Sequence, residues 1–231
     1  MRRSLPILVR APVKASASEE SMERQPPALA APAIEPAHVA LQVPPRLVFL
    51  FSGHMVDAPD RAEPRFPAEK EGIAARAIAA ALDELGAGPG DLALAQAANG
   101  GDLLFLEACK ARGLRLVLML PFAEAEFIAR SVCLHADGAR WRARYLALRA
   151  TLDDAPRILS ATTCDEEETS RYERCNLWLL QTALTWGAHR LRFICLWNGA
   201  EGTGPGGTDH MVRAVRRHTD RITWLDTRTL W

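Results

Sequence analysis

The segment GPGGTDHM, residues 204–211, places glycines and capping residues between an apolar run and a basic amphipathic run. The pair Gly206–Gly207 leaves the backbone unhindered, and Pro205 stiffens the approach to it. Thr208 or Asp209 can cap a helix or bond to a ligand hydroxyl. Free N–H groups at a helix start attract anions because they lie at the positive end of the helix dipole. The segment therefore predicts a loop that holds a phosphate.

A second segment of the same type, AANGGD, ends at Asp102 and precedes another run of helical character. Gly100 and Gly101 could let an anion approach that helix start in the same way. Alternatively, Asn99 and Asp102 are ordinary caps, and the glycines only allow a strand and a helix to pack closely. Neither segment matches GxGxxG or GxxxxGK[ST], which argues against a standard NAD site and a Walker-type NTPase.

A third candidate is the pair Ser52 and Gly53, which directly follows the first long apolar run. The pair could present a hydroxyl and an open backbone N–H to a phosphate or a sugar, or Gly53 could merely permit a tight turn. His54 comes next and has no second ligand at metal spacing, which is typical of a hydrogen-bonding loop residue. No metal site is predicted.

Acidic residues that follow the predicted strands keep an enzyme among the alternatives. Cleavage of an N-glycosidic bond, or transfer of a deoxyribosyl group, needs a carboxylate near the anomeric carbon. For each acid alone, a solvated charge or a helix-start charge is the commoner explanation. Arg171 and Asn176, near the head of a predicted packing helix, could reach a base or a phosphate. The candidate acids are Asp57, Asp60, Glu124 and Glu126.

Six apolar runs of strand length alternate with helical stretches, and they must position these segments. The runs are apolar throughout, as is typical of parallel strands that are covered on both faces. We therefore predict an α/β fold with a Rossmann-like, doubly wound, mainly parallel sheet of about six strands and helices on both faces. Such sheets bind ligands at the carboxyl ends of their strands, where the chain order reverses. The runs are at 46–52, 91–95, 114–120, 156–160, 190–197 and 221–225.

Residues 1–45 differ in composition from the rest of the chain. They hold eight of the fifteen prolines and show neither alternation nor helical periodicity. We predict a disordered Pro/Ala-rich linker over 1–45 and one domain over 46–231. A tail of this kind suggests that the domain is tethered to a fused or associated effector, and a homo-oligomer is also compatible with the sequence.

Charge and cysteine content limit the partners and the compartment. Lys and Arg together number 28, as do Asp and Glu, so the chain lacks the net field that nucleic-acid binding usually needs. The five cysteines are odd in number and widely spaced, which predicts neither a disulfide framework nor a zinc site. We expect a cytoplasmic protein without membrane insertion, because no apolar run has the required length.

Three stretches together resemble the SLOG superfamily, the Rossmann-like group that includes the DNA-processing Smf proteins and the LOG cytokinin-activating phosphoribohydrolases. They are LVFLFSG, AANGGDLLFLEACKARGLRLVLMLPF, and LRFICLWNG followed by GPGGTDHM, and the similarity covers about residues 46–225. The resemblance implies a nucleotide or nucleotide-derived ligand and no other cofactor. It matches Ser52 and Gly53 to the first ligand loop, Asn99–Asp102 to the second, and Pro205–Thr208 to the phosphate loop.

The sequence departs from the family where the hydrolases carry their cleaving groups. Their PGGxGTxxE loop ends in a catalytic Glu, whereas Arg213 occupies that position here, and the arginine near their second loop is missing. The resemblance thus implies a ligand sensor or signalling module. The alternatives are a nucleoside or nucleotide N-glycosidase, a deoxyribosyltransferase-like enzyme, and a protein-interaction module. The last is suggested by the tail and by Trp141 and Trp231, which we expect to be exposed.

Overall fold

The computed structural model divides the chain into two units, Met1–Ala33 and Ile34–Trp231. The first unit lies outside the residues that the structure describes, and so does the predicted linker up to residue 33. The second unit carries the fold. Its described residues are 34–39, 41, 43–134, 137–160, 167–200 and 206–231.

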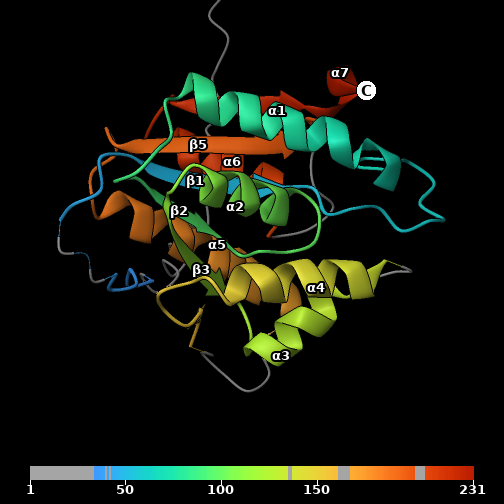
Figure 1. The fold of residues 1–231 in the computed structure, drawn as a ribbon, viewed down its shortest axis with the longest axis horizontal. Helices are drawn as coiled ribbons and strands as arrows, with labels where there is room; N and C mark the ends of the chain where they lie inside the picture. The colour runs from blue at the N-terminus through green and yellow to red at the C-terminus, as the bar shows by residue number, and fades with distance from the viewer. Residues whose placement is uncertain (1–33, 40, 42, 135–136, 161–166, 201–205) are drawn as a thin grey trace, which may run out of the picture. The chain divides into compact units, whose positions relative to one another are not determined.

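The described part of the chain forms one six-stranded sheet in which every neighbouring pair is parallel, in the order β4-β3-β2-β1-β5-β6. Figure 1 shows β5, β1, β2 and β3 side by side. This confirms the predicted doubly wound α/β class, and each predicted run overlaps a strand. The strands are β1 Val48–Gly53, β2 Leu92–Ala95, β3 Arg115–Leu120, β4 Arg157–Ile158, β5 Leu191–Trp197 and β6 Ile222–Asp226.

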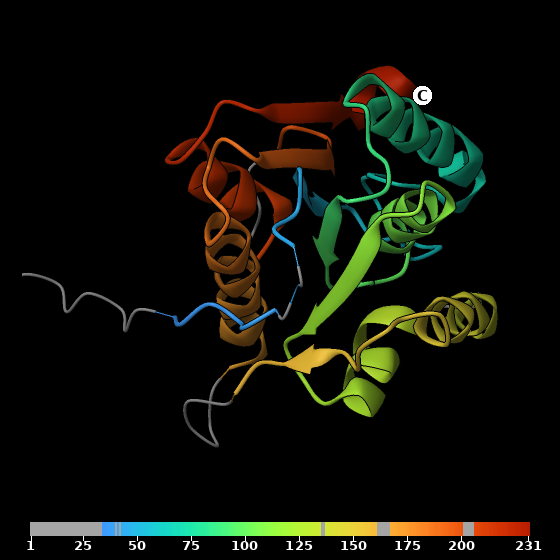
Figure 2. The same cartoon turned by 60° about the vertical axis from the view of Figure 1, so that its left-hand side comes forward.

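Helices cover both faces of the sheet, which explains why the strands are apolar throughout. Figure 2 shows α1, α2 and α4 (teal, green and yellow) on one side and α5 and α6 (orange and red) on the other. In β1, Phe49 and Phe51 join the core on the first side, while Val48 and Leu50 join the core on the second. The helices are α1 Glu71–Glu84, α2 Gly101–Ala111, α3 Glu124–Phe127, α4 Gly138–Arg149, α5 Glu168–Leu184, α6 Thr208–Arg216 and α7 Thr227–Leu230.

The order of the strands creates one reversal point. From β1 the chain runs outward through β2, β3 and β4, and it then returns to the other side of β1 for β5 and β6. Strands β1 and β5 are therefore neighbours, with Ser52 opposite Cys195 and Gly53 opposite Leu196. Ligands of doubly wound sheets bind at such a reversal, beyond the carboxyl ends of the strands.

The packed domain begins before Arg46, which corrects the predicted boundary of the linker. Val39 is buried in the core that α5 and α6 share, and Ala37 donates its backbone N–H to Thr182 Oγ1 on α5 at 2.9 Å. Leu41 packs against the same core. Ala37, Val39 and Leu41 alternate with a period of two, which is the pattern of an extended segment that covers a surface.

Neither tryptophan that was expected to be exposed forms an open apolar surface. Trp141 is only 1% exposed, and the guanidinium groups of Arg140 and Arg144 lie over its ring. Trp231 is partly buried and stacks on Phe66 with 5.6 Å between ring centroids. Their burial removes the structural support for a protein-interaction module built on these residues.

Two further properties concern only the described ranges. None of the helices in them is long and apolar enough to cross a membrane. Within the same ranges, no group of three or more His, Cys, Asp or Glu side chains is arranged to hold a metal ion.

Candidate functional site

A cavity of about 650 Å³ opens at the carboxyl ends of β1 and β5, where the chain order reverses. Its size lies within the usual range for small-molecule sites. Its wall is formed by the end of β1, the loop before α1, the segment from the end of β2 to the start of α2, Ser131, the inward face of α5, the end of β5 and the start of α6. The predicted site residues that line it are Ser52, Gly53, His54, Asp57, Asp102, Asn176, Gly206, Gly207 and Thr208.

The end of β1 meets the start of α6, so that two predicted ligand segments form one wall. The hydroxyls of Ser52 and Thr208 lie 3.4 Å apart, although 156 positions separate them in the sequence. A 3.4 Å separation is long for a hydroxyl pair, so both groups can turn toward a ligand. Pro205, the remaining residue of the predicted phosphate loop, lies outside the described residues.

The start of α6 requires glycine at position 206 and borders the cavity. Gly206 has a φ of +90°, and a Cβ there would lie 3.0 Å from Glu173 N and from Tyr172 Cβ. Gly207 is the N-cap, with a φ of −76°, and provides no side-chain cap. The N–H groups of the first turn have no acceptor within their own helix, so they are available to an anion.

A chain of buried amides fixes this loop to the rest of the site. Gln96, just after β2, donates from Nε2 to Asn176 Oδ1 on α5 at 2.7 Å. Asn176 in turn donates from Nδ2 to the carbonyl oxygen of Gly206 at 2.7 Å. The sequence left open that Asn176 reaches a base or a phosphate, but both ends of its amide bond to Gln96 and Gly206. Arg171 does not line the cavity, and its guanidinium lies over the ring of Phe122.

The second glycine pair, for which the sequence left anion binding and close packing open, does not line the cavity. Gly101 donates its N–H to the carbonyl oxygen of His54 at 3.0 Å. Gly100 has a φ of +83°, and a Cβ there would lie 2.8 Å from Val56 N. Asn99 is buried, and its backbone N–H donates to Ser131 O. The glycines therefore let the start of α2 pack against the loop that follows β1.

His54 is buried beside the end of β5. Its Nε2 lies 3.2 Å from both the backbone N and the side-chain Oδ1 of Asn198. Burial, and to a lesser extent the charge of Arg65, lower the pKa of His54 to about 4. His54 is consequently neutral near pH 7, and its imidazole joins the β1 loop to the β5 end by hydrogen bonding.

Asp102, at the start of α2, presents a carboxyl group to the cavity. Ala98 donates its N–H to Asp102 Oδ2 at 3.4 Å, which is a long contact. Because the group is buried, the pKa of Asp102 is raised to about 7. A large fraction of this carboxyl therefore carries a proton at neutral pH, and it can donate a hydrogen bond.

Of the four acids proposed for an enzyme, Asp57 alone lines the cavity. Asp57 Oδ2 accepts from the backbone N–H groups of Arg65 and Phe66, both at 2.6 Å, and its Oδ1 lies 3.3 Å from Arg61 Nε. These contacts shape the loop before α1 and engage the carboxylate. Asp60 is exposed.

The two glutamates of that set make contacts elsewhere. Glu124 accepts from Tyr145 Oη at 3.0 Å and pairs with Arg149. Glu126 pairs with Arg130 at 2.9 Å. Neither glutamate lines the cavity, so neither is placed to act on a ligand there.

The structure adds charged residues to the site that the sequence-based set omitted. Arg61 and Arg65 line the cavity from the loop before α1. Asp209, expected only as a cap or a hydroxyl contact, also lines it and forms an ion pair with Arg213 one turn later. Arg61 and Arg65 lie in the long polar segment that follows the first strand. Their closeness to Ser52 in the sequence was the signal that could have identified them.

A scan against models of known protein families found no match, and no curated protein sequence matches the chain. The assignment of the site therefore depends on its own residues and on the topology of the sheet.

Proposed function

We propose that the cavity binds a nucleotide or a nucleotide-derived ligand and that the domain acts as a sensor of that ligand. The observation that carries the proposal is the glycine-lined start of α6, which borders a cavity of ligand size at the reversal point of the sheet. Doubly wound sheets bind nucleotides at this position, and helix starts there bind the phosphate.

The phosphate would lie at the start of α6, near the hydroxyls of Ser52 and Thr208. Backbone N–H groups and hydroxyls can donate hydrogen bonds to a phosphate that carries either one or two negative charges. Arg61 and Arg65 supply positive charge from the facing loop, although Asp57 neutralises part of it. The site thus combines donors for an anion with a mixed polar wall for the remainder of the ligand.

The resemblance to the SLOG superfamily supports the same ligand class and a role without cleavage. Arg213, at the position of the hydrolases' catalytic Glu, has an exposed side chain that pairs with Asp209. Arg213 does not line the cavity. A cation at that position cannot stabilise the positive charge of an oxocarbenium-like transition state.

Calorimetric titration of the full chain tests the proposal. We expect at least one of the four ribonucleoside 5′-monophosphates to bind, and to bind at least tenfold more tightly than its nucleoside. Arg61→Ala should weaken binding about fivefold, since it removes a cation from the cavity wall. The matched control is Arg142→Ala on α4, which should bind like the wild type. Equal affinity for nucleotide and nucleoside would contradict a phosphate site, and binding of none of the four would contradict the proposal.

An N-glycosidase or deoxyribosyltransferase-like enzyme is the second candidate, favoured by one observation. Several carboxyl groups line the cavity, among them those of Asp57, Asp102 and Asp209. A carboxyl with a pKa of about 7 suits acid or base catalysis. Chromatography of incubated nucleoside monophosphates decides between the candidates: base release that is lost in Asp102→Asn supports the enzyme, while unchanged nucleotide supports the sensor.

A further inference from the structure

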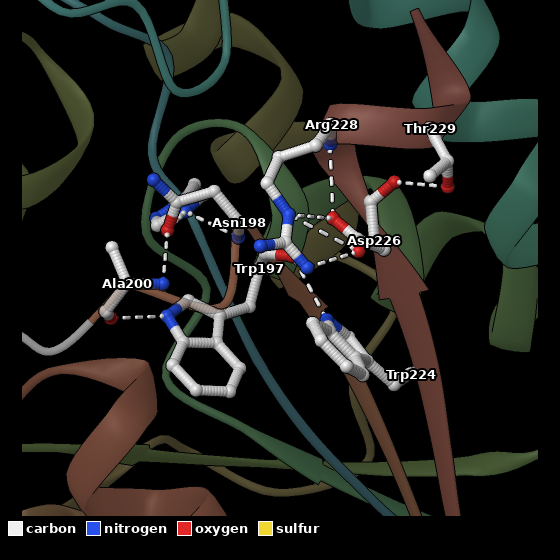
Figure 3. A network of polar contacts seen from close by, with 8 residues as sticks. Trp197, Asn198, Ala200, Trp224, Asp226, Arg228 and Thr229 are labelled. Carbon is white, nitrogen blue, oxygen red and sulfur yellow. Dashed lines mark hydrogen bonds and ion pairs between the residues drawn. The ribbon is translucent and has the colours of Figure 1, made fainter.

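Two tryptophans lie together where β5 ends and β6 runs beside it. The rings of Trp197 and Trp224 are 5.6 Å apart between centroids and inclined by 38°. Trp197 lines the cavity, whereas Trp224 does not line it and is 42% exposed. Figure 3 shows the two indoles with the polar groups that surround them.

Hydrogen bonds determine the position of both indoles. Trp197 donates from Nε1 to the carbonyl oxygen of Ala200 at 3.0 Å, and Trp224 donates from Nε1 to the carbonyl oxygen of Trp197 at 2.9 Å (Figure 3). The only polar group of each indole therefore has a partner within the protein. Trp197 is therefore left with no free side-chain donor, and its ring can engage a ligand only through its aromatic surface.

A second layer of contacts supports Trp224 from outside. Arg228 lies over the Trp224 ring at 5.5 Å, and its guanidinium is held by Asp226, with Nη2 at 2.6 Å from Oδ2. Gly199 has a φ of +75°, and a Cβ there would lie 3.0 Å from the Trp224 ring. The backbone after β5 thus approaches Trp224 closely, so the aromatic pair is held in place before any ligand binds.

We propose that Trp197 is the platform on which an aromatic base of the ligand stacks. This inference rests on the proposed nucleotide function and specifies the part of the cavity that binds the base. Trp197 and the start of α6 line the same cavity, so one ligand with a phosphate and a base joined by a sugar can reach both. A ring that is already fixed loses little conformational entropy on binding, which favours stacking on it.

The other role for this pair would be a docking surface for a protein. The contacts on the outer side favour stacking, because Arg228 and Gly199 already cover parts of Trp224. Trp197, in contrast, borders the cavity. A docking surface would leave nucleotide affinity unchanged when Trp197 is replaced, so the experiment below separates the two.

The test compares the four ribonucleoside 5′-monophosphates with ribose 5-phosphate, which has the phosphate and the sugar but no base. In Trp197→Leu we expect the best-binding nucleotide to lose about tenfold in affinity, which is about 1.4 kcal/mol. Affinity for ribose 5-phosphate should stay the same. Trp197→Phe should recover to within about threefold of the wild type, because it restores an aromatic face. Trp186→Phe, outside the cavity, is the matched control.

Tryptophan fluorescence gives a second readout that does not depend on the Leu variant. The bound nucleotide should quench emission in the wild type and in Trp186→Phe but not in Trp197→Phe, and ribose 5-phosphate should quench in none of them. Unchanged nucleotide affinity in Trp197→Leu, or an equal loss for ribose 5-phosphate, overturns the stacking role while leaving the proposed function in place. Failure of every nucleotide to bind the wild type overturns the proposed function itself.

Discussion

The two glycine pairs of this molecule look alike in sequence and differ in what surrounds them. At the start of α2, the Gly101 N–H is taken by the carbonyl oxygen of His54, and the loop after β1 fills the space beside Gly100. At the start of α6, Gly206 and Gly207 border the cavity instead. A glycine pair before a helix permits both close packing and anion binding. Whether another segment packs against the glycine pair decides between these two roles. We call the start of α2 the closed start and the start of α6 the open start.

The largest expected effect is a loss of stability when a methyl group is added at the closed start, at the beginning of α2. Gly100→Ala should lower the free energy of unfolding by about 4 kcal/mol, because a side chain is strained at φ +83° and would meet the backbone of Val56 and His54. Urea unfolding measures the loss. The matched variant at the open start is Gly207→Ala, where a φ of −76° suits alanine, and it should cost under about 1 kcal/mol. Equal losses of unfolding free energy in Gly100→Ala and Gly207→Ala would contradict the difference between the closed and the open start.

The next effect concerns Asp102 at the closed start, whose pKa is raised to about 7. Because the folded state holds this proton more tightly than the unfolded state, the stabilisation is complete below about pH 4 and is lost as the pH rises through 7. Relative to the wild type, Asp102→Asn should therefore lose about 3 kcal/mol of unfolding free energy between pH 7 and pH 4. Urea unfolding of both proteins across this pH range measures the change. If their difference in unfolding free energy stays constant, the raised pKa of Asp102 is contradicted.

His54 should give a smaller effect of the opposite sign. Its pKa is lowered to about 4, so the unfolded state binds a proton more readily, and the stabilisation present above about pH 6.5 is lost as the pH falls through 4. His54→Gln should gain slightly less than about 3 kcal/mol relative to the wild type between pH 7 and pH 4. The same unfolding series measures it. A change in the same direction as Asp102→Asn would contradict the assigned burial of His54.

The smallest effect on stability is expected at the open start. Ser52→Ala removes a hydroxyl whose 3.4 Å contact with Thr208 is long, so it should change the unfolding free energy by less than about 0.5 kcal/mol. Affinity for the best-binding nucleotide should nevertheless fall about fivefold, since the hydroxyl borders the phosphate position. Calorimetry and urea unfolding of the same sample separate the two. A large stability loss would show that Ser52 has a packing role.

The sheet was predictable because apolar runs of strand length are typical of strands that are buried on both faces, and each run overlaps the strand expected from it. Other features depend on partners that are distant in sequence. Trp141 lies among arginines and therefore looks exposed, but its ring is buried and the arginine heads cover it. The alternation of Ala37, Val39 and Leu41 is too short and too close to prolines to stand out from a linker.

The candidate site was predictable in part for the same reason. Ser52 and Thr208 were found because both follow strands at the reversal point, whereas Arg61 and Arg65 carry no local motif. The pKa of Asp102 results from burial by other elements, which sequence spacing does not reveal. The role of Gly100 depends on the loop after β1, so the sequence alone left packing and anion binding open.

Amide NMR of the ¹⁵N-labelled full chain, titrated with the best-binding nucleotide monophosphate, tests the central claim most directly. We expect the amide signals of Thr208, Asp209 and His210 to shift as the start of α6 receives the phosphate. Those of Gly100 and Gly101 should stay in place because that helix start is packed. Shifts centred on Gly100 and Gly101, with the α6 amides unchanged, would contradict the central claim.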